Sequence, residues 1–292
     1  MFSFLIPVQN YAVHPLVEDL VRQGREAQVD FEVLVAEDGS NSDFIEKNAT
    51  LTSFPEVKQL VSEQDIGRAA IRNYLADQAS GEYLVFIDAD SGLPEQYIAM
   101  WQQHIGQAPV LVGGTRYALA LQNPEESLRW TYGRAREEVS AKERNRNPHR
   151  SLTANNLFVE KAVFENVRFD ASITEYGHED TLFGKALYEA GVNILHIDNA
   201  VEHLGLETNA RFLEKTRVAI QTLRSLQRQG KIYPSDVRLL QVYGKLGRWG
   251  VPGLLRMFAK PLLAYLEKRL KKRDPRLWQL DVYKLVILAT LR

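Results

Sequence analysis

The sequence predicts an α/β protein with a mostly parallel sheet, helices on both faces of that sheet and a helical C-terminal extension. Two observations predict this class. Short apolar runs alternate with helix-patterned segments over the first two-thirds of the 292 residues. Beyond about residue 210 the strand pattern stops, and a basic segment with helical spacing follows.

Each predicted strand is a short apolar run that is bounded by turn formers or polar residues. Each predicted helix repeats apolar residues at three or four positions, as Leu16, Leu20 and Val21 do. We expect strands at residues 2–7, 31–36, 57–61, 83–87, 110–113, 155–159 and 193–197, and helices at residues 14–23, 43–50, 66–78, 94–104, 160–166, 181–190 and 211–229. Residues 117–150 are polar and rich in arginine, which fits either a helix with a mobile loop beside a cleft or a solvated, salt-bridged helix.

Composition excludes several classes of protein. The chain is 45% hydrophobic and 25% charged, as in ordinary globular proteins, and a net charge of −1 argues against nucleic acid as a partner. The absence of cysteine excludes disulfides, thiolate zinc and cysteine catalysis, and it fits a reducing compartment. The N-terminus reads as a strand and not as a signal peptide, and no apolar run is long enough to span a membrane, so we expect a cytoplasmic protein.

Two aspartates, Asp88 and Asp90, directly follow the predicted strand 83–87. Carboxylates at a strand end present hard oxygen ligands, which suit Mg²⁺ or Mn²⁺ and, through the metal, a nucleotide pyrophosphate. Aspartates in this position also close turns or cap the next helix, so the triplet alone leaves both interpretations open.

Three polar strand ends are expected at one edge of the sheet, because ligands of parallel α/β sheets bind outside the carboxyl ends of the strands. They are Pro7, the pair Glu37-Asp38, and the Asp88-Ala89-Asp90 triplet. Asp38 could accept a base N–H or form an Asx turn. Gly67-Arg68 opens a helix, where the backbone can approach an anion.

Four motifs in order complete the pattern: Ile6-Pro7-Val8-Gln9-Asn10, Ala36-Glu37-Asp38-Gly39-Ser40, Asp88-Ala89-Asp90 and Gly177-His178-Glu179-Asp180. With them the chain, from about residue 2 to residue 206, resembles a family 2 glycosyltransferase with the GT-A fold, of the bacterial polysaccharide-building type. The resemblance implies that Asp38 accepts the uracil N–H. Nucleotide-sugar contacts are implied for Pro7, Val8, Asn10, Glu37, Asp38, Gly67, Arg68, Asn73, Asp88, Ala89, Asn155 and Asn156.

The resemblance also implies a metal site and a catalytic base. Asp90 would bind Mn²⁺ or Mg²⁺ directly, Asp88 would reach the ribose or the metal through water, and His203 would be a further metal ligand. Asp180 would be the base that deprotonates the acceptor hydroxyl, and Glu179 would help to hold sugar or acceptor. A structural alternative stays open for the acidic pair, which could cap the following helix, and His203 could be a loop histidine without function.

The chain also departs from the family pattern. Gln9 stands where many relatives have an aromatic residue, and Glu37-Asp38 replaces the usual Asp-Asp. No Gln-x-x-Arg-Trp motif and no multi-helix membrane domain follow, which argues against a processive synthase.

The predicted function is therefore that of a metal-dependent inverting glycosyltransferase of the hexosyltransferase class (EC 2.4). It would move a hexose or N-acetylhexosamine from a UDP-sugar to a hydroxyl of a glycan or lipid-linked acceptor. The alternative is a non-catalytic nucleotide-sugar-binding subunit of a glycan assembly complex. A sugar nucleotidyltransferase is disfavoured, because the glycine-rich first loop of that class is missing.

We expect a catalytic domain over residues 1–210 and a helical basic extension over 211–292. From Lys245 on, twelve basic residues face three acidic ones, a net charge of +9, so the rest of the chain carries about −10. The segment 254–266 has an apolar face formed by Leu254, Leu255, Phe258, Leu262, Tyr265 and Leu266. Such a helix either lies on the inner face of the cell membrane as a peripheral contact or packs on the catalytic domain. A homodimer is left open.

Overall fold

The computed structural model describes residues 1–291, which form two compact units. The first unit contains Met1–Ala118, Glu137–Thr174 and Glu179–Gly205. The second contains Leu119–Arg136, Glu175–His178 and the chain from Leu206 onward. Two segments that precede residue 206 therefore cluster with the C-terminal helices.

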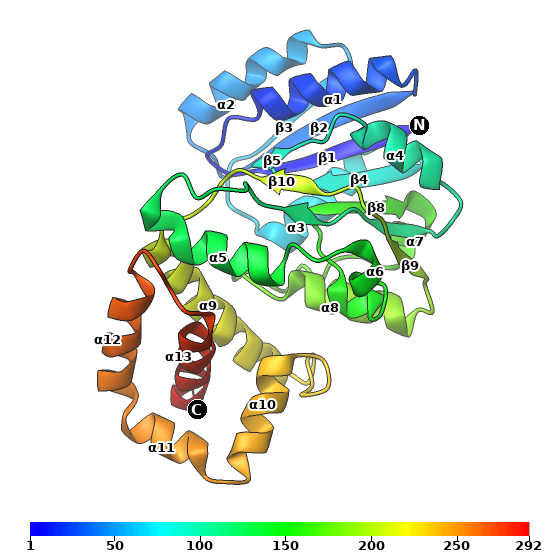
Figure 1. Ribbon diagram of the computed structural model, residues 1–292. Coiled ribbons are helices and arrows are strands. Elements are labelled where there is room, and N and C mark those ends of the chain that lie inside the picture. The colour runs from blue at the N-terminus through cyan, green and yellow to red at the C-terminus, as the bar shows by residue number, and fades with distance from the viewer. Residues whose placement is uncertain (292) are drawn as a thin grey trace. The chain divides into compact units, whose positions relative to one another are not determined.

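The first unit is built on a seven-stranded sheet with the order β3-β2-β1-β4-β8-β6-β9 (Figure 1). Only β8 runs antiparallel to its neighbours β4 and β6, and every other pairing in the sheet is parallel. The mixed, mostly parallel sheet that the sequence predicts is thus confirmed. In sheet order the strands are β3 (Val57–Ser62), β2 (Phe31–Asp38), β1 (Phe2–Val8), β4 (Tyr83–Ile87), β8 (Asn156–Glu160), β6 (Val110–Val112) and β9 (Ile194–His196).

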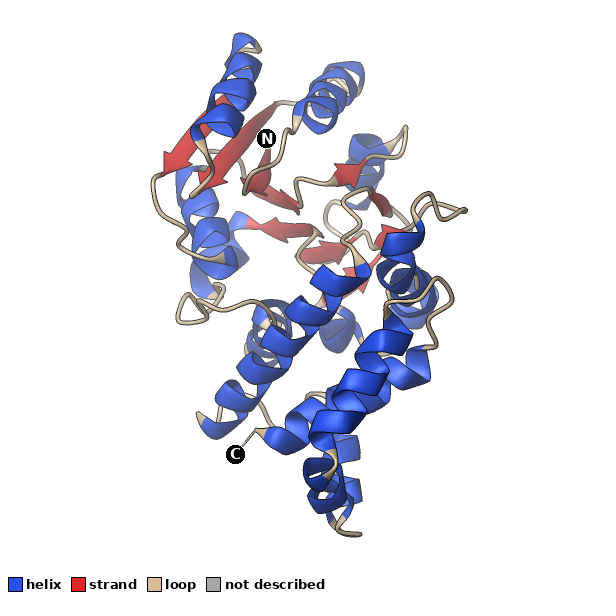
Figure 2. Cartoon of the chain, turned by 90° about the vertical axis from the view of Figure 1, so that its left-hand side faces the viewer, coloured by secondary structure: helices blue, strands red, loops and turns tan. Residues whose placement is uncertain are grey.

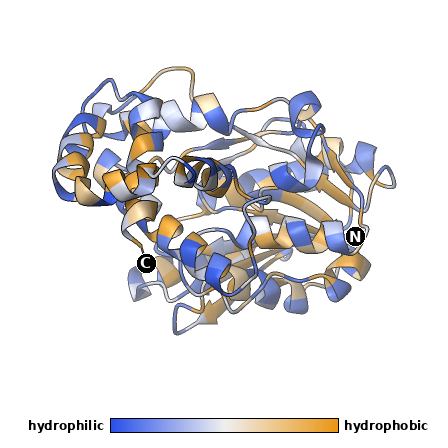
Figure 3. Cartoon of the chain, turned by 90° about the horizontal axis from the view of Figure 1, so that it is seen from below, coloured by the Kyte–Doolittle hydropathy of each residue, from blue (hydrophilic) through white to orange (hydrophobic). Residues whose placement is uncertain are grey.

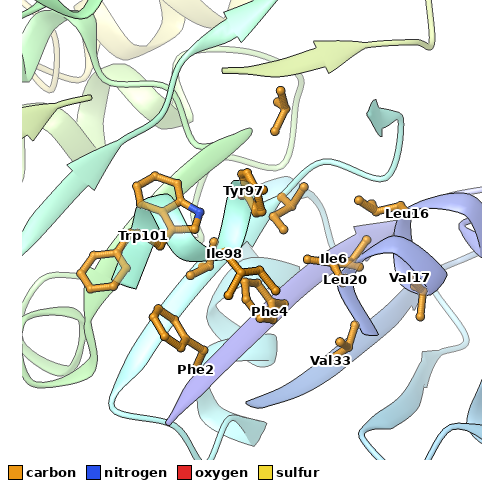
Figure 4. Close-up of a cluster of buried hydrophobic side chains, with 14 of the residues drawn as sticks. Phe2, Phe4, Ile6, Leu16, Val17, Leu20, Val33, Tyr97, Ile98 and Trp101 are labelled. Carbon is orange, nitrogen blue, oxygen red and sulfur yellow. The ribbon is translucent and has the colours of Figure 1, made fainter. Parts of the chain in front are cut away.

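Alternation along each strand produces a separate hydrophobic core on each face of the sheet. Phe2, Phe4 and Ile6 of β1 point to one face and pack with buried side chains of two helices, α1 (His14–Glu26) and α4 (Tyr97–His104) (Figure 4). Leu5 points to the other face and joins a second cluster with residues of α3 (Arg68–Gln78), α7 (Lys161–Asn166) and α8 (Glu179–Glu189). Both faces of the central strands are therefore buried, which is why these strands are apolar throughout.

Helices cover the sheet on both faces, as the βαβ order requires (Figure 2). Most boundaries differ from the predicted ones by one to three residues. The differences of three residues are at α4, which starts at Tyr97 and not at Pro94, and at α1, which ends at Glu26 and not at Gln23. The helices of this unit are α1 (His14–Glu26), α2 (Ser42–Ala49), η1 (Thr50–Ser53), α3 (Arg68–Gln78), α4 (Tyr97–His104), α6 (Ala141–Arg144), η3 (Pro148–Ser151), α7 (Lys161–Asn166) and α8 (Glu179–Glu189).

A second, three-stranded sheet with the order β5-β10-β7 brings distant parts of the chain together. Its strands are β5 (Ser91–Gly92), β10 (Val201–His203) and β7 (Thr115–Arg116). The pairing places His203 opposite Ser91, directly after the Asp88-Ala89-Asp90 triplet.

The second unit is helical and centres on α13 (Leu277–Thr290), most of whose apolar residues are buried. Hydrophobic residues occur on these C-terminal helices as well as on the strands (Figure 3). No helix within residues 1–291 is long and apolar enough to cross a membrane. The other helices of the second unit are η2 (Pro124–Glu126), α5 (Ser127–Arg136), α9 (Asn209–Arg228), α10 (Arg238–Gly247), α11 (Val251–Met257) and α12 (Ala259–Leu270).

Two expectations need correction in this part of the chain. The predicted helix over residues 254–266 is broken into α11 and α12 at Phe258, whose ψ of 12° leaves the helical region. Leu266 is buried and does not belong to a solvent-facing apolar stripe. The arginine-rich segment 117–150 contains two helices, and one of its arginines, Arg144, is buried with bonds to backbone carbonyls. Arg292 lies outside the described residues.

Candidate active site

The candidate site lies at the carboxyl ends of the central strands, within the first unit. The register pairs Val8 with Glu37, Asp38 with Ser62, and Ile87 with Asn156. Asp38 and Asp88 therefore lie at the same edge of the sheet, as the sequence predicts for ligands of an open parallel sheet.

Asp38 is held at this edge by the loop that precedes α3. Its Oδ1 accepts a hydrogen bond from the Ile66 amide at 2.7 Å, and the residue is only 5% exposed. Burial raises the pKa of Asp38, the Ile66 amide opposes this shift, and the charge of Asp65 adds to it. Gly39 has a φ of +63°, and a Cβ there would lie 2.6 Å from the Asp65 amide nitrogen, so only glycine allows the loop to approach.

The first motif makes hydrogen bonds to the loop after β2 and to the loop before α3. Asn10, with a φ of 52°, donates its amide to Ser40 Oγ and accepts the Asn41 amide on its Oδ1. The Gln9 side chain donates to Asp65 Oδ2 at 2.8 Å. Gln9 thus ties two loops together. Pro7 is half-buried and Val8 is buried.

Two predicted contact residues point away from the edge and are fully buried. Glu37 accepts a hydrogen bond from Asn48 Nδ2 at 2.7 Å. Asn156 donates to the carbonyls of Gly114 and Asn199 and accepts from Tyr97 Oη. Strand alternation explains both positions, because Glu37 shares the α1 and α4 face with Val35, whereas Asp38 lies on the α3 face. Their side chains support the edge and do not line it.

Arg72 is a buried cation at the centre of the site. Its Nη2 donates to Asp88 Oδ1 at 2.7 Å, its side chain is 3% exposed, and its guanidinium lies 5.7 Å from the centre of the Phe169 ring. Its spacing of three residues from Ala69 and from Leu75 places Arg72 on the buried side of α3, but no local signal identifies Asp88 as its partner.

Asp180 lies in the first turn of α8 close to this cation. Its Oδ1 atom is inaccessible and has no hydrogen-bond partner among the described residues. Burial and the neighbouring charge of Glu179 raise the pKa of Asp180 to about 7, although Arg72 and the Ala154 amide act in the opposite direction. An unpartnered carboxylate oxygen with this pKa is suited to accept a proton near neutral pH.

The carboxylate of Asp90 and the imidazole of His203 lie close together. Asp90 Oδ2 and His203 Nδ1 are 3.5 Å apart. Burial alone would raise the pKa of Asp90, but the hydrogen bond and charge of His203 bring it below its ordinary value. The backbone passes closely over this pair, because a Cβ at Gly205 would lie 2.3 Å from Asp90 Oδ2.

These residues fit a divalent metal that takes its other ligands from a diphosphate. Two donors 3.5 Å apart can both reach one ion at the usual bond length of about 2.1 Å. The described residues contain no group of three or more His, Asp or Glu side chains that could hold a metal alone. Asp88, the other predicted ligand, is instead bound to Arg72.

Three of the remaining predicted residues lie on α3 or at its start. Arg68 is half-exposed and its Nη1 lies 3.9 Å from Glu179 Oε1, so the structure brings these two together. Gly67 precedes Arg68 with a φ of +89° at the start of α3. Asn73 holds the loop at residue 169, donating to the Phe169 carbonyl and accepting its amide.

Asn155 donates to Thr115 Oγ1 at 2.8 Å, and its carbonyl accepts the Asp88 amide. Ala89 is half-buried between the two aspartates. Both residues lie beside the Asp88-Ala89-Asp90 triplet.

A family model described as "Glycosyl transferase family 2" matches residues 3–164, more than half of the chain. The chain belongs to glycosyl transferase family 2. The family resemblance inferred from the sequence is thereby confirmed, and with it the assignment of the chain to the glycosyltransferases. The matched residues include Asp38, Arg72 and Asp90, whereas Asp180 and His203 lie beyond them.

Solved structures share the fold of this glycosyltransferase. S. aureus TarS 1-349 in complex with UDP-GlcNAc is 19% identical, with a TM-score of 0.51 over 76% of this chain and 66% of that one. A mannosyltransferase, PcManGT from Pyrobaculum calidifontis, in complex with GDP-Man and Mn²⁺, is 16% identical, with a TM-score of 0.61 over 99% and 85% of the two chains. In a further TarS structure the match spans only 39% of the TarS chain. No curated protein matches the sequence.

The raised pKa of Asp180 predicts a pH-dependent stability of this glycosyltransferase. Between its ordinary pKa and about 7, the folded state keeps a proton that the unfolded state releases, so the free energy of unfolding falls as pH rises. We expect Asp180→Asn to stabilise the protein at pH 8 by a few kcal/mol, and to have almost no effect near pH 4.

Urea unfolding of both proteins at the two pH values measures this difference. Asp43→Asn, at an exposed carboxylate in the first turn of α2, is the control and should change neither value. Equal stability of wild type and Asp180→Asn at pH 8 would show that Asp180 has an ordinary pKa.

Proposed function

We propose that this chain is a metal-dependent inverting glycosyltransferase that moves a hexose or N-acetylhexosamine from a UDP-sugar to a hydroxyl of a glycan or lipid-linked acceptor. One observation carries the proposal. The inaccessible, unpartnered Oδ1 of Asp180 lies in the same acidic cluster as Arg72 and Asp88, at the strand edge where Asp38 and Asp90 also lie.

The donor nucleotide would bind along the edge of the sheet. Asp38 would accept the uracil N–H, since a carboxylate can accept further bonds beside the one from the Ile66 amide. The diphosphate would lie near Gly67 and Arg68, where the start of α3 favours an anion. The complexes of TarS with UDP-GlcNAc and of PcManGT with GDP-Man support a nucleotide sugar as the donor.

Asp90 and His203 would hold the divalent metal, and a carboxylate with an imidazole suits Mn²⁺ better than Ca²⁺. The metal would supply charge neutralisation on the departing diphosphate. PcManGT was solved with Mn²⁺, which supports a divalent ion in this fold.

Asp180 would take the proton of the acceptor hydroxyl as its oxygen attacks the anomeric carbon from the face opposite the diphosphate. The new bond joins the acceptor oxygen to the anomeric carbon, and the bond from that carbon to the diphosphate breaks. A base with a pKa of about 7 is matched to this transfer near neutral pH. Glu179, close to Arg68, would orient the sugar or the acceptor.

Replacing the base separates a catalytic from a non-catalytic function. We expect Asp180→Asn to lower the rate of transfer by about a hundredfold to ten-thousandfold, because the proton acceptor is lost while the shape is kept. UDP affinity should change less than about threefold, since Asp180 is not placed at the base or diphosphate.

The rate would be measured as UDP release with Mn²⁺, a panel of UDP-sugars and candidate glycan acceptors, and the affinity by calorimetry. Asp43→Asn again serves as the matched carboxamide control. UDP binding without transfer by the wild type, with any donor, would favour the non-catalytic subunit instead.

A second prediction concerns the metal. We expect Asp90→Ala and His203→Ala each to weaken Mn²⁺-dependent UDP binding by more than about tenfold, because each removes a ligand atom. Calorimetry of UDP binding with Mn²⁺ and with excess EDTA measures the effect. His104→Ala, in α4, is the control histidine. A wild-type affinity that is the same in Mn²⁺ and in EDTA would contradict metal dependence.

A further inference from the structure

The second unit exposes large apolar side chains on α11, on α12 and on the turn before them. Five of these residues are more than half exposed, which is unusual for side chains of this size in a cluster. They are Trp249 (84%), Leu254 (57%), Met257 (66%), Phe258 (55%) and Tyr265 (56%).

These residues are not the outer part of a core. Helix α12 already packs within the unit, because its Ala259, Leu266 and Leu270 are buried, and α11 is tied to α13 by a hydrogen bond from Arg256 Nε to the Ala289 carbonyl. Leu254 and Met257 lie three residues apart on α11, and Tyr265 lies on α12, so both helices present apolar side chains to solvent. Of the apolar residues that the sequence shows in segment 254–266, some are therefore buried inside the unit and others are exposed to solvent.

The exposed residues lie within the most basic part of the chain. Residues 245–273 contain nine lysines and arginines and one acidic residue, Glu267. Glu267 is bound to Arg217 at 2.7 Å, so it does not offset the charge nearby. Lys245, Arg248, Lys260 and Lys268 are all exposed in the same stretch of the chain as the apolar side chains.

We propose that these five apolar residues and four basic residues, here called the aromatic-basic face, bind an anionic lipid surface. Lysine and arginine are attracted to anionic headgroups by about 1 kcal/mol each near the surface. Tryptophan, phenylalanine, leucine and methionine gain free energy by entering the boundary between headgroups and acyl chains. The proposal does not depend on the proposed chemistry of the first unit.

Two other occupants fit this face less well. A second copy related by a two-fold axis would place the same basic patch against itself, and like charges would repel. Nucleic acid would match the charge and could stack on Trp249 and Tyr265, but it would leave Leu254 and Met257 without apolar partners.

Vesicle flotation with the full chain tests the proposal. The probes are phosphatidylcholine vesicles and vesicles in which a third of the lipid is phosphatidylglycerol. We expect binding only to the anionic vesicles, and less of it as salt is raised. Trp249→Ala with Phe258→Ala should weaken binding more than about tenfold. Arg248→Glu with Lys260→Glu should weaken binding to the anionic vesicles by about fivefold or more for each substituted residue.

Matched variants on the first unit control for general effects. Tyr188→Ala is an equally exposed aromatic on α8, and Lys47→Glu with Lys142→Glu repeats the charge change. Neither should alter flotation, and thermal unfolding and UDP affinity should be the same in all variants. The proposal is wrong if the wild type ignores anionic vesicles, or if it dimerises or binds single-stranded DNA through the same residues instead.

Discussion

The buried guanidinium of Arg72 is the interaction on which the acidic cluster of this glycosyltransferase depends. Arg72 is bound to Asp88, and its charge lowers the pKa of Asp180 against burial and the charge of Glu179. Without Arg72, the carboxylates of Asp88 and Asp180 would lie near one another, poorly solvated and with no positive charge beside them. Removing one partner of a buried ion pair typically costs 3–5 kcal/mol, so Arg72 supports both the fold and the chemistry of this edge.

The alternation of side chains along the strands decides which polar residues reach that cluster. Asp38, Asp88 and Arg72 lie on the α3 face, whereas Glu37 and Asn156 lie on the opposite face and are spent on internal hydrogen bonds. Glu37 and Asp38, neighbours in one motif, therefore lie on opposite faces of the sheet, and Glu37 helps to hold the sheet edge in place. The small sheet then brings His203 to Asp90 from far along the chain.

Much of the fold could be predicted from the sequence, because strands buried on both faces are continuous apolar runs, as at Tyr83–Ile87. Local motifs also predicted that Asp38 and Asp88 share an edge. Contacts between distant parts of the chain, and the burial that they cause, could not be predicted. Nothing local shows that Arg72 is buried against Asp88, that the Asn156 amide makes all its hydrogen bonds inside the protein, or that Leu266 is buried while Met257 is exposed. The period of two in the strand 31–38 could have separated Glu37 from Asp38.

The central claim is a direct displacement assisted by Asp180, and the configuration of the product tests it most directly. Proton NMR of the glycoside formed from the accepted UDP-sugar reports the anomeric coupling of the new linkage. A displacement in one step predicts a product of inverted configuration relative to the donor, formed by the wild type and lost in Asp180→Asn. A product that retains the donor configuration, or one formed equally fast by Asp180→Asn, would contradict the account.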